Sequence, residues 1–503
     1  MKNLINKTIC AATITVVLFS SCSKDFETIN TDPNNIPYAL PQQLMAPALV
    51  NSLTYNLIRN RSFNNELMQV TVDQSDAEGR VFRYDHRPSL SDYQYNGLYS
   101  ELTNFKDMYT IADEPLNYNT SYKGISLICQ SWIYSILTDT YGDVPYFQSN
   151  LARDSGIYEP RFDAQRDIYA AIFQKLEQAN MLLDSNTAIV GSSDPVFSGS
   201  ISRWRKFGNS LYLRLLLRVS GKAEASAAAA AKIKDIVETN ASKYPIMTSN
   251  DDNAILKWTG VGPFISPLNT VREQDYRAPS IGSFFIDHLA VWGDPRIDIS
   301  LGANGINRWG IAPYQGTFVG VQSGYLPGAE PLKKAYFYSN TSTTSLQKDP
   351  MTGIMMTYAE LRFILCEAAL KGWIGSSAES HYKAGVQYSI TQWMPAWAVP
   401  IDTYLSGADL QWPAAGTETE KMERLHLLKY YALFMTDSQQ WFEYRRTGHP
   451  VLPIGPGVKN GGVMPARMVY PVYVQSTNPT NYQLAVAAQG PDQMNTQVWW
   501  QKP

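Results

Sequence analysis

The sequence predicts a mainly α protein in which helix pairs form a superhelical scaffold that carries a loop-rich, irregular lobe. Apolar residues recur at the three- and four-residue spacing of amphipathic helices through much of the chain. The helical segments come in neighbouring pairs with short loops between them, which favours antiparallel hairpins. Two segments, about 243–356 and about 447–503, lack this periodicity, and the first is rich in Gly, Pro, Asn, Ser and aromatic residues.

Residues 1–21 are predicted to be a signal peptide. A positively charged start leads into the apolar stretch 8–19, which is too short for a bilayer that takes about 20 residues to span. Two serines then precede Cys22, as in a lipobox whose cysteine is lipidated. The alternative is an ordinary signal peptide with an incidental cysteine. Lipidation of Cys22, for example by palmitate, predicts a protein anchored to a membrane.

The remaining chain is predicted to be a tether followed by one body. Residues 22–41 are polar and rich in Asn and Pro, and residues 42–503 contain the helical pattern and both irregular segments. No later stretch approaches the length of apolar sequence that a transmembrane helix requires. The net charge of −3, without a basic run, argues against a nucleic-acid partner.

The helices of the body follow one another in order. Helical spacing is visible around 44–53 and 98–108, and helices are predicted over 119–141, 164–184, 201–220, 223–239, 279–291, 357–372, 380–393, 418–435 and 437–446. The helix over 119–141 ends at Gly142, shortly before Pro145, which is ordinary helix-ending chemistry. The lengths and pairing of these helices indicate tetratricopeptide-like units.

Cysteines and tryptophans within the helices are predicted to be structural. Cys129 and Cys366 lie in apolar runs and are expected to be buried free thiols rather than a disulfide framework. Four tryptophans in helical segments are assigned to the core: Trp132, Trp204, Trp373 and Trp441.

No catalytic motif is found. Metalloprotease, nucleophile-elbow, phosphate-loop and dinucleotide patterns are missing from the sequence, and the five histidines have no metal-ligand spacing. We therefore predict no enzyme activity, no cofactor and no metal. The one carboxylate pair considered is Asp139 with Asp143, and a structural role for Asp143 in a turn is favoured over catalysis.

Several short motifs occur in a fixed order along the chain. They are CSKDFETINTDPNN at 22–35, LTDTYGDVPY at 137–146, YEPRFDAQ at 158–165, WFEYRRTGHP at 441–450 and PARMVYP at 465–471. Together they resemble the SusD/RagB nutrient-binding outer-membrane lipoproteins, in particular the SusD-like branch of Bacteroidetes-type outer membranes. Asn478, Asn481 and Trp499 fit the closing part of the same pattern.

The resemblance implies a fold, a location and a partner. The fold is a set of tetratricopeptide-like helix pairs beneath a loop-rich ligand face, and the location is the outer membrane, with the lipid-anchored protein facing the cell exterior. The partner is a SusC-like TonB-dependent transporter that the lipoprotein covers as a lid. The resemblance implies no catalytic activity. Arg445 and Arg446 are expected to pair with acids or backbone carbonyls inside the helical layer.

The predicted ligand is an oligosaccharide, since the chain holds 12 Trp, 31 Tyr and 18 Phe and aromatic rings with polar neighbours bind sugars. In starch-binding relatives the aromatic residues come from an early loop and the central lobe, which correspond here to 76–95 and 272–325. The candidate ligand-binding residues are Arg80, Tyr84, Tyr93, Tyr276, Trp309 and Tyr314, followed by Trp393 and Trp397. The alternatives are peptide capture as in the RagB branch, a glycoside hydrolase, and a structural adhesin or scaffold.

Overall fold

The computed structural model describes residues 39–329 and 331–502. The predicted signal peptide, Cys22 and nearly all of the predicted tether lie outside the described residues. The part from Pro41 onward forms one compact unit. Within the described ranges, no helix combines the length and the apolar character that crossing a membrane requires.

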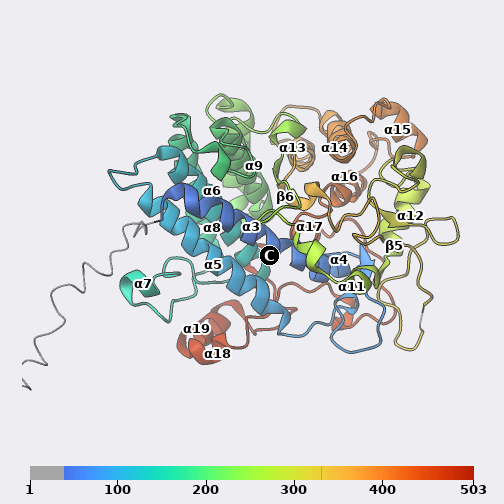
Figure 1. Ribbon diagram of the computed structural model, residues 1–503, viewed down its shortest axis with the longest axis horizontal. Helices are drawn as coiled ribbons and strands as arrows, with labels where there is room; N and C mark the ends of the chain where they lie inside the picture. The colour runs from blue at the N-terminus through green and yellow to red at the C-terminus, as the bar shows by residue number, and fades with distance from the viewer. Residues whose placement is uncertain (1–38, 330, 503) are drawn as a thin grey trace, which may run out of the picture. The chain divides into compact units, whose positions relative to one another are not determined.

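Six helices in the first half of this unit pack against one another in chain order (Figure 1). They are α3 (Pro41–Arg59), α5 (Leu90–Ile111), α6 (Thr120–Tyr141), α8 (Gln165–Asp184), α9 (Ile201–Val219) and α10 (Ala223–Lys234). Each helix contacts its predecessor, which is the arrangement of stacked antiparallel helix pairs. The mainly helical fold class predicted from the sequence is confirmed.

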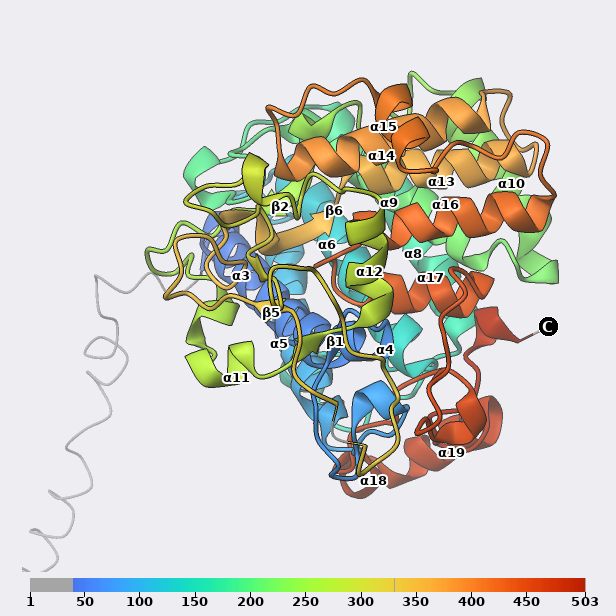
Figure 2. The same ribbon diagram turned by 90° about the vertical axis from the view of Figure 1, so that its right-hand side faces the viewer.

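A second set of helices continues this layer from α9. It consists of α13 (Tyr358–Leu370), α14 (Ala378–Trp393), α16 (Glu418–Ala432) and α17 (Gln439–Thr447). Helix α13 packs on α9, and α13, α14 and α16 contact one another (Figure 2). The helix boundaries lie within three residues of the ranges predicted for 357–372, 380–393, 418–435 and 437–446.

Helix α6 lies at the centre of the first set, and its sequence explains both of its ends. The Asn119 side chain accepts hydrogen bonds from the amides of Ser121 and Tyr122, which caps the helix start. Gly142 follows the last turn at φ 85°, a conformation that favours glycine. Nearly every residue between these ends is buried, so the helix is covered on all sides.

The lobe over 243–356 contains short strands and helices between its loops. Three antiparallel pairs join β1 (Thr71–Val72) to β3 (Ser280–Ile281), β2 (Ala254–Leu256) to β6 (Gly353–Met356), and β4 (Ile311–Ala312) to β5 (Tyr336–Phe337). Helices α11 (Glu273–Arg277) and α12 (Ser283–Val291) lie between β2 and β4 in the sequence. The predicted helix over 279–291 starts later, because Ser280 and Ile281 pair with β1.

Short elements complete the described part of the chain. They include α4 (Asn65–Leu67), α7 (Ala152–Ser155), α15 (Ile401–Gly407), α18 (Val474–Thr477), α19 (Pro479–Gln489), the π-helices Asn60–Asn64 and Asp235–Thr239, and several single turns of 3-10 helix. The prediction that 447–503 is irregular is wrong over α19. Pro479 at its first position is a helix-start signal, but only Ala485 and Gln489 are buried, so no apolar stripe marks the helix.

The core confirms most of the structural assignments made for single residues. Cys129 and Cys366 are buried free cysteines. The side chains of Trp132, Trp204 and Trp441 are completely buried. Trp373 is only half-buried and packs at the edge of the core.

Close packing of α13 on α14 depends on a glycine. A methyl group at Gly385 would lie 2.8 Å from the Phe363 ring, and Phe363 is completely buried and cannot swing outward. We expect Gly385→Ala to lower the free energy of unfolding by about 1–3 kcal/mol, the usual cost of overpacking, despite the better helix propensity of alanine. Chemical denaturation measures the change.

The matched control for this substitution is Gly407→Ala, at the end of α15, where an added methyl group meets open space. It is expected to leave the stability unchanged or slightly higher. Equal effects of the two substitutions would contradict the packing argument.

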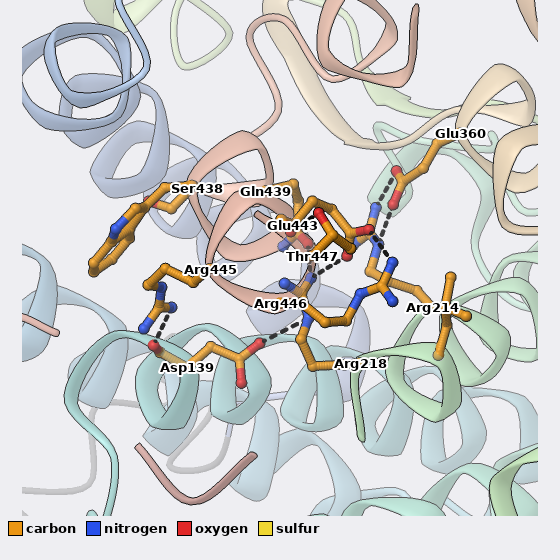
Figure 3. A network of polar contacts seen from close by, with 12 residues as sticks. Asp139, Arg214, Arg218, Glu360, Ser438, Gln439, Glu443, Arg445, Arg446 and Thr447 are labelled. Atoms are coloured by element: carbon orange, nitrogen blue, oxygen red, sulfur yellow. Dashed lines mark hydrogen bonds and ion pairs between the residues drawn. The ribbon is translucent and has the colours of Figure 1, made fainter. Parts of the chain in front are cut away.

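The helical layers are joined by a buried network of ionic side chains (Figure 3). Arg446 on α17 contacts Glu367 on α13 at 2.6 Å and Glu443 on its own helix at 2.8 Å. Lys429 on α16 reaches the same Glu443 carboxylate at 2.6 Å. In all four residues less than a tenth of the side chain is exposed, so each charge depends on its partners rather than on water.

The neighbouring Arg445 extends the network toward α6. Its guanidinium donates to the backbone carbonyls of Ala466 and Asp139, and it lies 3.9 Å from the centre of the Trp441 ring. The prediction that Arg445 and Arg446 pair with carbonyls and acids inside the helical layer is confirmed. A further buried pair, Arg214 with Glu360 at 2.6 Å, joins α9 to α13.

Candidate functional site

The carboxylates singled out from the sequence are engaged in structural contacts. Asp139 accepts hydrogen bonds from the Tyr169 hydroxyl at 2.6 Å and the Trp500 indole at 2.7 Å. Asp143 accepts from the backbone amide of Gln165, the first residue of α8, at 2.9 Å. Burial raises the pKa of both carboxyls.

One cluster of possible metal-ligating groups occurs among the described residues: Glu367, His426 and Glu443, whose ligand atoms lie within 4.8 Å of one another. The donors of Arg446 and Lys429 already contact these carboxylates. Although burial alone raises the pKa of Glu367, the Arg446 guanidinium and His426 hold it well below its usual value. The residues therefore form an ion network rather than a set of vacant ligands. The sequence did not reveal the cluster, because it joins three separate helices.

Three of the predicted ligand-binding residues are packed inside the protein. Trp309 has no exposed surface, stacks on Phe285 and lies beneath the Arg296 guanidinium. Tyr84 and Tyr276 are 2% and 8% exposed. A ring with so little exposed area offers a ligand no face for stacking, so the structure gives these three side chains a packing role.

The other three candidates reach the surface in separate places. Arg80 forms an ion pair with Asp73 at 2.7 Å. Tyr93, at the start of α5, is 39% exposed and contacts the edge of the Tyr55 ring. Tyr314 is half-buried in a turn closed by hydrogen bonds with Thr317. The six residues come from different segments, and none of the pockets described below brings them together. Their role in ligand binding stays a prediction.

A better-defined site lies at the end of α14, which we call the tryptophan pocket. It has a volume of about 400 Å³, within the range of small-molecule sites, and its walls are mainly apolar. It is lined by Leu301, Gly302, Ala303, Arg308, Thr344, Trp393, Met394, Pro395, Ala396 and Trp397. Two of these, Trp393 and Trp397, were second-rank candidates from the sequence.

The local sequence explains why two tryptophans are found here. Helix α14 ends at Trp393, and the chain turns so that the amide of Trp397 donates to the carbonyl of Met394 at 2.9 Å. Trp393 is 4% exposed, and the edge of its ring contacts the buried Trp309. Trp397 is half-buried, and its ring meets Tyr404 at 88°. The pocket wall therefore contains one buried tryptophan ring and one partly accessible one.

Arg308 supplies the polar side of the tryptophan pocket. Its Nε donates to the Trp393 carbonyl at 2.9 Å, and its guanidinium pairs with Asp349 at 2.5 Å and lies over the Trp393 ring. These contacts fix the guanidinium in one orientation. Apolar walls with one fixed donor group and the Thr344 side chain are suited to a ligand with an apolar face and hydroxyl groups.

The fold defines a class of protein: a helical-repeat scaffold with a loop-rich lobe. The tryptophan pocket, which has the size of a small-molecule site, lies where the lobe meets the end of α14. Over residues 33–471 the sequence matches the SusD-like family, described as starch-binding and associating with the outer membrane. The chain therefore belongs to the SusD-like family. No functionally curated protein matches the sequence.

Solved structures share the fold over almost the whole chain. A chitin-binding SusD homologue from Flavobacterium johnsoniae has a TM-score of 0.76 at 20% identity, over 92% of this chain and 98% of its own. A SusD homologue from Bacteroides uniformis has a TM-score of 0.75 at 24% identity, over 92% of this chain and 99% of its own. A third, from Bacteroides fragilis, has a TM-score of 0.74 at 23% identity with the same coverage.

Proposed function

We propose that this protein binds a nutrient oligosaccharide at the outer membrane, without altering it, and passes it to a SusC-like TonB-dependent transporter. The family description supports a saccharide ligand and an outer-membrane location. The chitin-binding homologue shows that a protein of this fold is known to hold a saccharide. In this proposal Cys22 carries the lipid anchor and the protein faces the cell exterior.

The observation that carries the proposal is the tryptophan pocket. A sugar ring has an apolar face of C–H groups and a rim of hydroxyls, so it needs an aromatic surface beside fixed hydrogen-bonding groups. Trp397 provides the surface, and Arg308 provides donors whose position is set by Asp349 and the Trp393 carbonyl. The volume of about 400 Å³ accommodates one or two sugar units.

Peptide capture is the second candidate function. A peptide would be held mainly by backbone hydrogen bonds along a groove or a sheet edge. The strands of the described residues are two to four residues long, which leaves little edge for such pairing. This observation favours the saccharide over the peptide.

Replacement of Trp397 by Ala is expected to weaken oligosaccharide binding about tenfold or more, because a partly exposed aromatic anchor is lost from the pocket. The dissociation constants of the wild type and the variant are compared by calorimetric titration with an oligosaccharide that binds the wild type. The matched control is Trp373→Ala, which removes another half-buried tryptophan, one that is not among the residues lining the pocket. If both substitutions weaken binding equally, the tryptophan pocket is not the site.

A further inference from the structure

Two lysines face a second pocket, which lies between α5, α6 and α8 and which we call the lysine pocket. It has a volume of about 320 Å³ and is lined by residues that include Lys106, Gln130, Asn150 and Lys175. Both ammonium groups lie over the ring of Tyr134, at 5.7 Å and 5.4 Å from its centre. The Lys175 ammonium is also 4.9 Å from the centre of the Tyr146 ring.

Neither lysine has an acidic partner in the described part of the chain. Lys106 donates to the backbone carbonyl of Ser149 at 2.6 Å and to its hydroxyl at 2.9 Å. Lys175 donates to the amide oxygen of Gln130 at 2.7 Å. An ammonium group has three N–H donors, so these neutral acceptors leave donors of both lysines available to a ligand.

The two acidic residues that line the pocket are engaged elsewhere. Asp107 and Asp154 are both paired with Arg153, each at 2.7 Å. When Lys106 and Lys175 are both protonated, the pocket region contains three cationic and two anionic side chains, and therefore one net positive charge. The two lysines contribute the cations that no acid neutralises.

If Lys106 and Lys175 had only a structural role, their arrangement would destabilise the folded protein. Desolvation lowers the pKa of Lys106 to about 8, and desolvation together with the charge of Lys106 lowers the pKa of Lys175 to about 7. Placing two like charges beside the same ring, without a carboxylate, opposes folding at neutral pH. Both costs are relieved when an anion binds to the two ammonium groups.

We propose that Lys106 and Lys175 form an oxyanion-binding site that takes the carboxylate or sulfate group of an acidic sugar. The volume accommodates about one sugar unit, and the two ammonium groups provide hydrogen bonds and charge for an oxyanion. The Tyr134 ring makes cation–π contact with both ammonium groups, and the Tyr146 ring with that of Lys175, and these contacts help to hold the groups in place.

A neighbouring pocket makes room for a longer ligand. It has a volume of about 390 Å³ and shares two lining residues, Thr103 and Asn150, with the lysine pocket. Tyr95, Tyr99 and the 39%-exposed Tyr473 line its other side. A chain with its acidic group bound to the lysines therefore has space to continue along α5. This site is separate from the tryptophan pocket and does not depend on the function proposed for that pocket.

The test is calorimetric titration of the purified protein with glucuronate and with glucose 6-sulfate, using glucose as the neutral control. We expect at least one of the two anions to bind, and Lys106→Gln and Lys175→Gln each to weaken that binding about tenfold or more. The charge-matched control Lys234→Gln, on the exposed side of α10, is expected to leave binding unchanged. Trp397→Ala is also expected to leave anion binding unchanged, which separates this site from the tryptophan pocket.

The two anions distinguish the possible sources of the oxyanion. Preference for glucuronate identifies a uronic acid, and preference for glucose 6-sulfate identifies a sulfated sugar. The proposal is overturned if neither anion binds at millimolar concentration. It is also overturned if an anion binds but neither lysine substitution weakens that binding.

A second measurement needs no substitution and therefore does not depend on the variants folding. An amine-acylating reagent is applied to the protein with and without the anion, and the modified lysines are counted by mass spectrometry. The anion is expected to slow the modification of Lys106 and Lys175 at least threefold and to leave Lys234 unaffected. Equal protection of all three lysines overturns the proposal.

Discussion

Replacing Arg446 by Met is expected to lower the free energy of unfolding by about 3–5 kcal/mol, the usual cost of removing one partner from a buried ion pair. The substitution leaves Glu367 and Glu443 without the guanidinium that contacts both. Arg446 and His426 lower the pKa of Glu367, so its carboxylate is charged at neutral pH. In the variant this buried charge has lost its main partner, which destabilises the folded state. Urea unfolding, monitored by circular dichroism, measures the change.

The control for this prediction is Arg166→Met, which breaks an ion pair with Asp167 in which more than half of the arginine side chain is exposed. It is expected to leave the free energy of unfolding unchanged, because water already solvates the charges of an exposed ion pair. A second variant, Arg446→Met combined with Glu367→Gln, is expected to recover part of the loss, since it removes one of the two stranded charges. An Arg446→Met protein as stable as the wild type would show that the network does not hold the helices together.

Glu66→Gln is expected to be more stable than the wild type by an amount that grows as the pH is raised. Burial raises the pKa of Glu66 to about 8 from a usual value of 4.5, although Thr71 and the Asp73 amide donate hydrogen bonds to it. In a group whose pKa is raised by folding, the folded state holds the proton more tightly than the unfolded state. The stability that this proton provides is complete below pH 4.5 and is lost as the pH rises toward 8.

The size of this effect follows from the difference in pKa. Each pH unit between the two pKa values removes about 1.4 kcal/mol, so the wild type loses on the order of 3 kcal/mol relative to Glu66→Gln between pH 5 and pH 7. The glutamine oxygen can still accept from the Asp73 amide and its NH₂ can donate to Thr71, so the variant keeps both contacts.

Unfolding curves measured at several pH values test this prediction. The difference in stability between the two proteins should grow from pH 5 to pH 8 and then level off. Glu379→Gln, at a side chain that is 42% exposed on α14, is the charge-matched control. A difference between Glu66→Gln and the wild type that does not change with pH would contradict the assignment of a raised pKa to Glu66.

The scaffold could be predicted from the sequence because most of its helices carry a local signal. The apolar residues of 119–141, and the Gly142 that ends them, specify α6 without reference to any other part of the chain. Helix α19 was missed because it lies on the surface with only two buried residues and has no apolar stripe. The buried ion network around Arg446 could not be predicted from the local sequence either. Glu367, which pairs with Arg446, and Lys429, which pairs with Glu443, come from other helices.

The ligand site could be predicted less well, for a physical reason. Aromatic residues were chosen from loop segments because loops usually lie at the surface, but the loop that contains Trp309 folds against the core and buries its ring. The signal for the tryptophan pocket was present as Trp393 and Trp397 around Pro395, where a helix ends and the chain turns outward. Nothing in the local sequence indicated that Lys106 and Lys175 face one pocket, because α6 lies between their helices in the chain.

The most direct test of the proposed function is an array of soluble glycans and peptides probed with the purified protein. We expect binding to one class of oligosaccharides and to no peptide, with the signal greatly reduced for Trp397→Ala and unchanged for Trp373→Ala. Binding to peptides alone would contradict saccharide capture and would move the protein to peptide uptake.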